Sequence, residues 1–186
     1  MDVYDNAAGG SFMLQIRRAS TAEFAAVRDF YYAVIDEMKD AEFKPGWERD
    51  VYPSQDFLRA SLDKGELYVG EIKGHLAAAM VVNHEYNESY DGAPWSVDAA
   101  DDELLVVHAL GVRPSFAGQG IAQAMTQYAI RLGRETGMKT IRLDVLKGNV
   151  PAERAYRKVG FAYCRTARMF YEDTGWTEFD LFEYIL

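Results

Sequence analysis

The chain has little cysteine, no long apolar run and few positive charges, and each shortage excludes a class of protein. Cys164 is the single cysteine among 186 residues. No disulfide can therefore form within the chain, and a metal site built from several cysteines is excluded. A chain without internal disulfides suits the reducing cytoplasm, where we expect this protein to be located. We expect no metal in its functional site.

No apolar run approaches the roughly 18 residues that a membrane-spanning helix requires. The first ten residues also lack the basic and then apolar order of a secretory signal. Acidic residues outnumber basic ones by 29 to 20, which gives a formal net charge of −9. Since nucleic acids are held mainly by clustered Lys and Arg, we expect neither a nucleic-acid partner nor a membrane partner.

What the sequence does contain is enough apolar material for the core of one domain. Hydrophobic residues make up 49% of the chain and aromatic residues 13%, which is typical of a globular protein. Residues 1–11, with their Asp, Asn and Gly residues, are expected to form a flexible tail. Residues 12–186 are expected to form a single domain.

Apolar periodicity and turn residues predict an alternation of strands and helices. The expected strands span residues 12–18, 66–72, 75–83, 103–112, 140–146, 161–171 and 177–186, and the expected helices span about 20–40, 54–64, 121–136 and 151–159. The strand, helix, strand order around Gly118 predicts a parallel pair in the middle of an otherwise mostly antiparallel sheet. The fold class is therefore α/β (α+β), with a mixed sheet and helices on both faces.

A glycine-rich turn joins the expected strand 103–112 to the helix that follows it. Free N–H groups at a helix start, together with the positive end of the helix dipole, favour binding of a pyrophosphate. A tight turn with close packing would need the same glycines, so this turn alone does not separate the two interpretations. A P-loop would need Lys and Ser or Thr where Ile121 and Ala122 stand, and a dinucleotide fingerprint would need a glycine at Gln123. Both of these motifs are excluded.

A second motif makes the pattern more specific. After the expected strand 140–146 the chain carries Asn149, Ala152, Tyr156, Gly160 and Phe161. This spacing closely resembles the Asn-x-x-Ala-x-x-x-Tyr-x-x-x-Gly-Phe segment of the GCN5-related N-acetyltransferase (GNAT) superfamily. The turn 117–122 resembles that superfamily's cofactor signature, Gln/Arg-x-x-Gly-x-Gly/Ala, although Ala117 replaces the long polar residue. The resemblance is strong from about residue 103 to 161, and the element order extends it over 12–186.

The resemblance implies the acyl-CoA N-acyltransferase fold and acetyl-CoA as cosubstrate. The pantetheine arm would enter a wedge between two splayed strands, and Gly111 is compatible with the bulge that splays them. The phosphates would lie on the glycine turn, where Arg113, Arg154 and Lys158 either add charge or are ordinary surface cations. The implied cofactor-binding residues are Leu110, Gly111, Val112, Ala117, Gly118, Gln119, Gly120, Ile121, Ala122, Asn149, Ala152 and Tyr156.

Acetyl transfer to an amine needs a base and an acid, because an alkylammonium with a pKa of about 10.4 must lose a proton before it attacks. His108 is the candidate base, with a nearby water as the alternative. It precedes Leu110 by two residues, which predicts that both side chains share one side of the strand. The arylalkylamine acetyltransferases of the superfamily have a catalytic histidine at this position. His108 is equally compatible with a satisfied core histidine.

Tyr156 is the candidate acid that protonates the departing thiolate, and the superfamily uses a tyrosine at this position. A buried aromatic residue on a short helix is the competing interpretation. The N–H of Leu110 is expected to stabilise the developing oxyanion. Asn149 would orient the cofactor or simply cap the helix.

The acceptor pocket is expected to form from the first helix and the loops 41–53 and 86–102. Their acidic and aromatic side chains favour an amine through charge attraction and cation–π contact. The candidate substrate-binding residues are Glu37, Trp47, His84, Tyr86 and His108, and Asp36, Tyr52, Glu85, Glu88, Tyr90 and Trp95 lie in or beside the same segments.

The expected function is transfer of an acetyl group from acetyl-CoA to a primary amine of a small molecule or peptide, by direct attack in a ternary complex. A non-catalytic acyl-CoA binding or sensing domain is the main alternative, and a generic phosphate or nucleotide binder is the second. A homodimer is possible through the strand 177–186, whose apolar character favours an edge contact.

Overall fold

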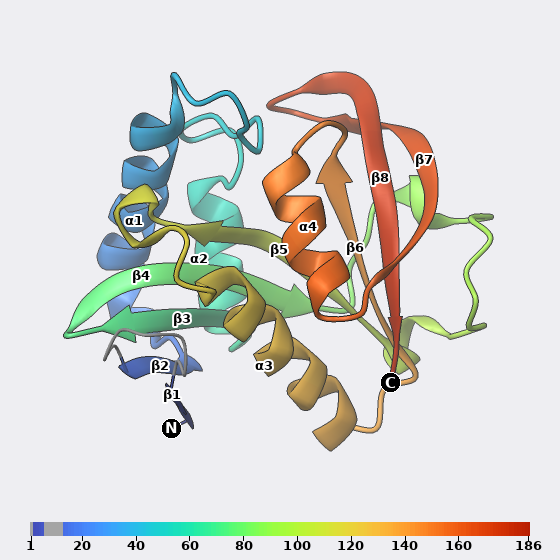
Figure 1. The fold of residues 1–186 in the computed structure, drawn as a ribbon, viewed down its shortest axis with the longest axis horizontal. Helices are drawn as coiled ribbons and strands as arrows, with labels where there is room; N and C mark the ends of the chain where they lie inside the picture. The colour runs from blue at the N-terminus through green and yellow to red at the C-terminus, as the bar shows by residue number, and fades with distance from the viewer. Residues whose placement is uncertain (1, 6–12) are drawn as a thin grey trace.

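The computed structural model describes residues 2–5 and 13–186. Within these residues one sheet of eight strands has the order β1-β2-β3-β4-β5-β6-β8-β7 (Figure 1). The strands are β1 (Asp2–Asp5), β2 (Met13–Arg18), β3 (Leu67–Ile72), β4 (His75–Asn83), β5 (Leu104–Val112), β6 (Thr140–Leu146), β7 (Ala162–Tyr171) and β8 (Gly175–Ile185). Neighbouring strands are antiparallel except β5 and β6, which are parallel. The expected mixed sheet with a central parallel pair is confirmed.

Helices cover both faces of the sheet (Figure 1). In the described residues they are α1 (Phe24–Met38), α2 (Gln55–Asp63), α3 (Ile121–Glu135) and α4 (Val150–Lys158). Along β4, Ala79 and Val81 pack in an apolar cluster with α1 and α2. Ala78 and Met80 pack in a second cluster, which contains residues of α3 and α4. Because successive strand side chains point to opposite faces, the sheet separates α1 and α2 from α3 and α4.

Local signals in the sequence place the helix ends. The Glu23 carboxylate accepts the Ser20 backbone N–H at 2.7 Å before α1, and Ser54 Oγ accepts the Phe57 N–H at 3.1 Å at the start of α2. Both contacts satisfy N–H groups that a helix leaves unpaired at its first turn. Gly137, with a φ of 72°, follows the end of α3. No helix of the described residues is both long and apolar enough to cross a membrane.

The N-terminal segment differs from the tail that the composition suggested. Residues 2–5 form β1, which pairs antiparallel with β2 from Asp2↔Ile16 to Asp5↔Met13. Pairing of this kind uses backbone groups, so the open edge of β2 accepts a short polar segment that has no apolar pattern of its own. Residues 1 and 6–12, including the expected strand start at residue 12, lie outside the described residues.

The parallel pair is short. Its pairing is limited to Leu104↔Thr140, Leu105↔Ile141 and Val106↔Arg142. Beyond these residues β5 stays paired with β4 as far as Val112, while β6 stays paired with β8 as far as Leu146. Since each strand follows a different neighbour, β5 and β6 diverge in the middle of the sheet. The two strands are therefore splayed, as the resemblance implied.

The C-terminal strand is not an edge strand. β8 pairs with β6 on one side and with β7 on the other. The expectation that this strand offers an edge for a dimer is therefore wrong, and in the described residues that edge of the sheet belongs to β7. The sequence showed a hairpin at this end of the chain but carried no signal for which of its two strands joins β6.

Candidate active site

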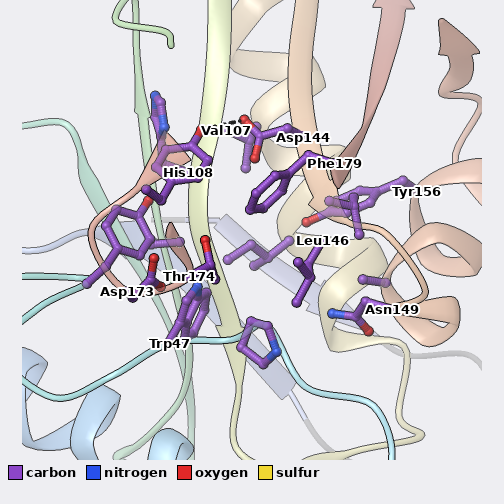
Figure 2. Close-up of a pocket in the computed structure, with 17 residues that line it drawn as sticks. Trp47, Val107, His108, Asp144, Leu146, Asn149, Tyr156, Asp173, Thr174 and Phe179 are labelled. Atoms are coloured by element: carbon purple, nitrogen blue, oxygen red, sulfur yellow. Dashed lines mark hydrogen bonds between the residues drawn. The ribbon is translucent and has the colours of Figure 1, made fainter. Parts of the chain in front are cut away.

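A cavity that opens to solvent lies where β5 and β6 diverge, and it holds about 670 Å³ when the open space at its mouth is included (Figure 2). Five separate segments contribute to it: the loop 41–53, β5, β6, α4 with the residue before it, and the β7–β8 hairpin. The lining residues are Pro45, Trp47, Tyr52, Val107, His108, Ala109, Leu110, Asp144, Val145, Leu146, Asn149, Ala152, Tyr156, Tyr171, Asp173, Thr174 and Phe179. The splayed strands thus leave a space that side chains from distant parts of the chain surround.

The glycine-rich turn lies between β5 and α3 and is open to solvent. Gly118 and Gly120 have φ values of 76° and 75°, and a Cβ added at Gly118 would meet no atom within 4 Å. The first backbone bond of α3 runs from the Ala124 N–H to the Gly120 carbonyl at 3.0 Å. The N–H groups of residues 121–123 precede that bond, at the positive end of the helix dipole. The turn can therefore receive an anion such as a pyrophosphate.

A bulge interrupts β5 beside the cavity. Ala79 of β4 pairs with Gly111 and Val81 pairs with His108, so Ala109 and Leu110 lie opposite the single residue Met80. Ala109 has a φ of 49°, and its carbonyl accepts the Tyr31 hydroxyl proton at 2.7 Å. The bulge therefore lies before Gly111, which was the position considered for it.

Gly111 has a different role, because a Cβ there would lie 3.0 Å from Cζ3 of Trp47. The absence of a side chain lets this tryptophan approach the strand. Leu110, the expected oxyanion donor, lines the cavity. Leu110 belongs to the bulge, and the extra residue of a bulge leaves backbone groups outside the regular hydrogen-bond pattern of the strands.

The bulge overturns the expectation that His108 and Leu110 share one side of β5. The ring of His108 packs against Phe57 of α2 at a centroid distance of 6.4 Å. Leu110 packs into the cluster on the opposite face, with α3 and α4. The extra residue shifts the alternation by one, so a spacing of two no longer means the same side. His108 still lines the cavity, from the face that carries α1 and α2.

The ring of His108 is held by two oxygen atoms. Its Nε2 lies 2.8 Å from Asn83 Oδ1 and 2.9 Å from the Glu85 carbonyl oxygen. Since a carbonyl oxygen can only accept, we assign the proton of the neutral ring to Nε2, which leaves Nδ1 as the basic nitrogen. Burial lowers the pKa of His108 to about 4. The ring is therefore neutral at pH 7 but is a weak base.

Tyr156 enters the cavity from the opposite side. Its side chain is 8% exposed, and Asn149 and Ala152 line the cavity beside it. Burial, with a smaller effect of the Asp144 carboxylate, raises the pKa of the Tyr156 hydroxyl. The hydroxyl therefore keeps its proton at neutral pH and can donate it. Figure 2 shows Tyr156 and Asn149 across the cavity from His108 and Trp47.

Asp144 is a site residue that the sequence reasoning did not single out. The flanking residues Leu143 and Val145 pack on the α3 and α4 face, so Asp144 points to the other face of β6 and lines the cavity. Its Oδ2 accepts hydroxyl protons from Tyr90 and Tyr171, both at 2.8 Å. Burial raises the pKa of the Asp144 carboxyl group. The available signal was a carboxylate near the end of a strand whose residues are mostly buried.

The loop 41–53 covers the cavity and meets the β7–β8 turn. A Cβ on Gly46 would lie 2.9 Å from Thr174 Cγ2 and 3.3 Å from Leu146 Cδ2. The rings of Tyr52 and Tyr171 lie 6.0 Å apart between centroids. Trp47 packs edge-on against Tyr31 of α1 at 5.7 Å. The contacts of Gly46 with Thr174 and of Tyr52 with Tyr171 close the acceptor side with residues more than a hundred positions apart.

The structure brings only part of the expected acceptor set to this cavity. Trp47, Tyr52 and His108 line it, whereas Glu37, His84 and Tyr86 do not. Glu37 forms an ion pair with Arg113. Arg113, one of the cations expected near the nucleotide, is therefore paired within the protein. His84 Nδ1 lies 2.7 Å from the Leu104 carbonyl oxygen, and the Tyr86 hydroxyl donates to Asp101 at 2.5 Å. Within the described residues no group of His, Cys, Asp and Glu side chains is arranged to hold a metal ion.

Two curated relatives share segments of this sequence. A streptothricin acetyltransferase from Streptomyces lavendulae is 33% identical over 76 residues, which are 41% of this chain and 40% of that protein. The uncharacterized N-acetyltransferase YesJ from Bacillus subtilis is 29% identical over 163 residues, which cover 76% of this chain and 87% of YesJ. The match to the streptothricin enzyme thus spans less than half of either protein.

Solved structures share the fold over nearly the whole chain. A GNAT-family acetyltransferase from Streptococcus agalactiae has a TM-score of 0.76 at 23% identity, covering 100% of this chain and 99% of that one. YncA from Salmonella typhimurium, solved with its cofactor acetyl-CoA, has a TM-score of 0.68 at 17% identity and covers 93% and 94%. A model of the acetyltransferase (GNAT) family matches residues 31–161. This match covers more than half of the sequence, so the protein belongs to the GNAT family of acetyltransferases.

Proposed function

We propose that this protein transfers the acetyl group of acetyl-CoA to a primary amine, by direct attack within a ternary complex. The observation that carries the proposal is the cavity at the diverging strands, which has Asn149, Ala152 and Tyr156 on one side and Trp47 and His108 on the other. Two reactants that enter from opposite faces of the sheet can meet in this space. Holding them there replaces a bimolecular encounter with an oriented one.

On the α3 side, the open glycine turn receives the diphosphate and the gap between β5 and β6 receives the pantetheine arm. Leu110 to Val112, residues 117–122 and Asn149 to Tyr156 are the proposed contacts. The N–H of Leu110, at the bulge, stabilises the oxyanion that develops when the amine attacks the thioester carbon. The residues present fit this ligand because Gly118 carries no side chain and the space beside it is open.

On the acceptor side, the ammonium must release a proton before its nitrogen attacks. Nδ1 of His108, or a water held near it, is the proposed base. The new C–N bond forms as the C–S bond breaks, and Tyr156 gives its proton to the departing sulfur. Cys164 lies outside the cavity lining, so an acetyl-enzyme intermediate on that thiol has no support.

The proposal is tested by measuring thiol release from acetyl-CoA with a panel of amines, together with calorimetry of coenzyme A and of ATP. We expect coenzyme A to bind more tightly than ATP and thiol release to depend on an amine. Binding of coenzyme A without turnover for any class of amine would instead favour an acyl-CoA sensing domain. Equal affinity for ATP and coenzyme A would favour a generic nucleotide binder.

A further inference from the structure

The charged residues that line the cavity are both acidic. Asp144 and Asp173 belong to the lining, and no Lys or Arg of the described residues does. Neither carboxylate has an ion-pair partner within residues 2–5 and 13–186. Partly buried carboxylates are usually paired with a cation, because removal from water disfavours an isolated charge. A ligand that carries positive charge would supply the missing partner.

Of the two carboxylate oxygens of Asp144, one accepts hydrogen bonds and the other can contact a ligand. Both tyrosine hydroxyls, from Tyr90 and Tyr171, donate to Oδ2. Oδ1 has no hydrogen-bond partner in the described part of the chain and is not a fully buried atom. Figure 2 shows Asp144 among the residues that line the cavity. The two tyrosines thus orient the carboxylate and leave its second oxygen for a ligand.

Asp173 lies at another part of the same cavity, in the turn between β7 and β8. Figure 2 shows it beside Thr174, on the side of Trp47. Burial raises the pKa of the Asp173 carboxyl group, with a smaller contribution from Glu48. Its carboxylate also acts on Tyr52 and Tyr171, raising the pKa of each hydroxyl together with Asp144. These two tyrosines therefore lie within electrostatic reach of both acids.

The two carboxylates lie on different elements around the cavity. Asp144 lies within electrostatic reach of Tyr156, the proposed acid, and contributes to the raised pKa of its hydroxyl. Asp144 also belongs to β6, one of the two strands between which the thioester would enter. Asp173 belongs to the hairpin turn that the loop 41–53 contacts. Asp144 is therefore the inner carboxylate and Asp173 the outer one.

We propose that the acceptor is an aliphatic diamine or a similar dication, whose reacting ammonium binds Asp144 and whose second positive group binds Asp173. The inference rests on the proposed acetyl transfer at the same cavity. The rings of Trp47, Tyr52 and Tyr171 provide apolar and cation-binding faces for the carbon chain between the two charges. Asp144 acts as a substrate-binding residue that holds the nitrogen, and the proton leaves to the base described above.

The test compares straight-chain diamines with monoamines of the same length, measured as kcat/KM for thiol release. For the unmodified protein we expect the diamine to be preferred by at least about tenfold, the size of one charge-assisted contact. Asp173→Asn is expected to bring this ratio close to one, because it removes the charge that binds the second ammonium of the diamine. Asp144→Asn is expected to lower kcat/KM for both amines by about tenfold or more, mainly through KM.

Two features of the experiment separate the loss of a charge from damage to the folded structure. The amide oxygen of Asn at position 144 can still accept the protons of Tyr90 and Tyr171, so the substitution removes charge while it keeps both bonds. Glu172→Gln removes the same charge one residue from Asp173, at an exposed side chain outside the cavity. This matched control should leave the ratio unchanged, and all three variants should bind acetyl-CoA like the unmodified protein.

A diamine-to-monoamine ratio near one in the unmodified protein, or a ratio that Asp173→Asn leaves unaltered, would overturn the inference while leaving acetyl transfer intact. If no amine is acetylated, the proposed function fails, and calorimetry of the diamine with the coenzyme A complex then decides the acceptor site by itself. Diamine binding that both Asp144→Asn and Asp173→Asn weaken would support the site. Absence of diamine binding would overturn it.

Discussion

The two sides of the cavity are built in different ways. The side that faces α3 and α4 comes from two segments, Leu110 to Ala122 with the glycine turn, and Asn149 to Tyr156. The opposite side combines the loop 41–53, His108, Asp144 and the β7–β8 hairpin. The first arrangement depends on local backbone geometry, whereas the second depends on contacts such as the packing of Tyr52 against Tyr171.

This difference indicates where the amino-acid sequence can change while the proposed acetyl transfer is retained. A turn that binds phosphates through backbone N–H groups needs glycines and a helix start, and it tolerates other side chains. A pocket assembled from loops changes its shape and charge with each residue of those loops, while the sheet holds the reacting groups in place. We therefore expect substitutions on the two sides to affect different measured quantities.

The largest effect is expected from Tyr156→Phe, which removes the proposed acid from the α4 side. Turnover should fall by about 100-fold, the usual contribution of a general acid, while the Kd of acetyl-CoA stays unchanged. Tyr163→Phe is the control, because that hydroxyl bonds to Thr166 on the exposed surface of β7. Steady-state rates and calorimetry measure the two quantities, and an unchanged rate would remove Tyr156 from the mechanism.

The His108→Gln variant tests the protonation state of this acceptor-side residue through the pH dependence of the free energy of unfolding. The folded pKa of about 4 lies below the ordinary 6.5, so the unfolded chain takes up the proton first. The stability associated with the neutral ring is therefore fully present above pH 6.5 and is lost as the pH falls towards 4. We expect a loss of about 2 kcal/mol between pH 7.5 and pH 5 that the Gln variant lacks.

Urea denaturation at the two pH values measures this difference. His75→Gln, at an exposed position at the start of β4, is the matched control and should retain the full acid sensitivity. If the His108→Gln variant loses as much stability between pH 7.5 and pH 5 as the unmodified protein, the His108 ring is not protected from protonation in the folded state.

Gly46→Ala tests the contact that closes the acceptor side. The residue has a φ of 85°, and its new Cβ would lie 2.9 Å from Thr174 Cγ2. We expect a loss of about 1.5 kcal/mol, of which about 1 kcal/mol comes from the left-handed backbone. Gly74→Ala has a φ of 77° and no atom within 4 Å, so it should show the backbone cost alone. Thermal unfolding compares them, and only Gly46→Ala should raise the KM of the amine.

Gly118→Ala makes the corresponding test on the phosphate turn. A Cβ at Gly118 meets no protein atom within 4 Å. The free energy of unfolding of the variant should therefore fall by only the backbone cost of about 1 kcal/mol, as in Gly74→Ala. Affinity for acetyl-CoA should fall by about tenfold, since the methyl group occupies space that the phosphates need. Calorimetry measures this affinity. An unchanged Kd would place the phosphates elsewhere.

The smallest expected effect is a gain in stability from Asp144→Asn. Burial raises the folded pKa of this carboxyl group above its unfolded value, so the ionised form costs stability at a pH above the folded pKa. This cost disappears as the pH falls below the unfolded pKa. The variant should be more stable by about 1 kcal/mol at pH 8 and equal to the unmodified protein near pH 3. Denaturation curves at both pH values test the sign.

Most elements of the fold could be predicted from the sequence, because apolar periodicity and turn residues act locally. The start of α1 after the Glu23 contact, the end of α3 before Gly137 and the hairpin that turns at Gly74 agree with the expected ranges of these elements. The pairing of β1 could not be predicted, since it uses backbone groups alone. The sheet order that places β8 beside β6 also has no local signal.

For the site, Leu110, Asn149, Ala152 and Tyr156 could be found because they lie in or beside two short motifs, each of which can be recognised along the chain. Their chemical roles stay predictions. The sides on which His108 and Leu110 lie could not be read from their spacing, because the bulge at Ala109 breaks the alternation. Asp144 and Asp173 become neighbours of one cavity only when β6 and the β7–β8 turn come together.

By itself, the sequence determined the elements and the glycine turn, since hydrophobic period, caps and left-handed glycines are properties of neighbouring residues. Only the tertiary structure decided that the parallel pair stops at Val106 and Arg142, and that two acidic side chains share the space beyond it. Strand pairing and the closure of loops join residues far apart in the chain, and their free energy depends on the whole packed arrangement.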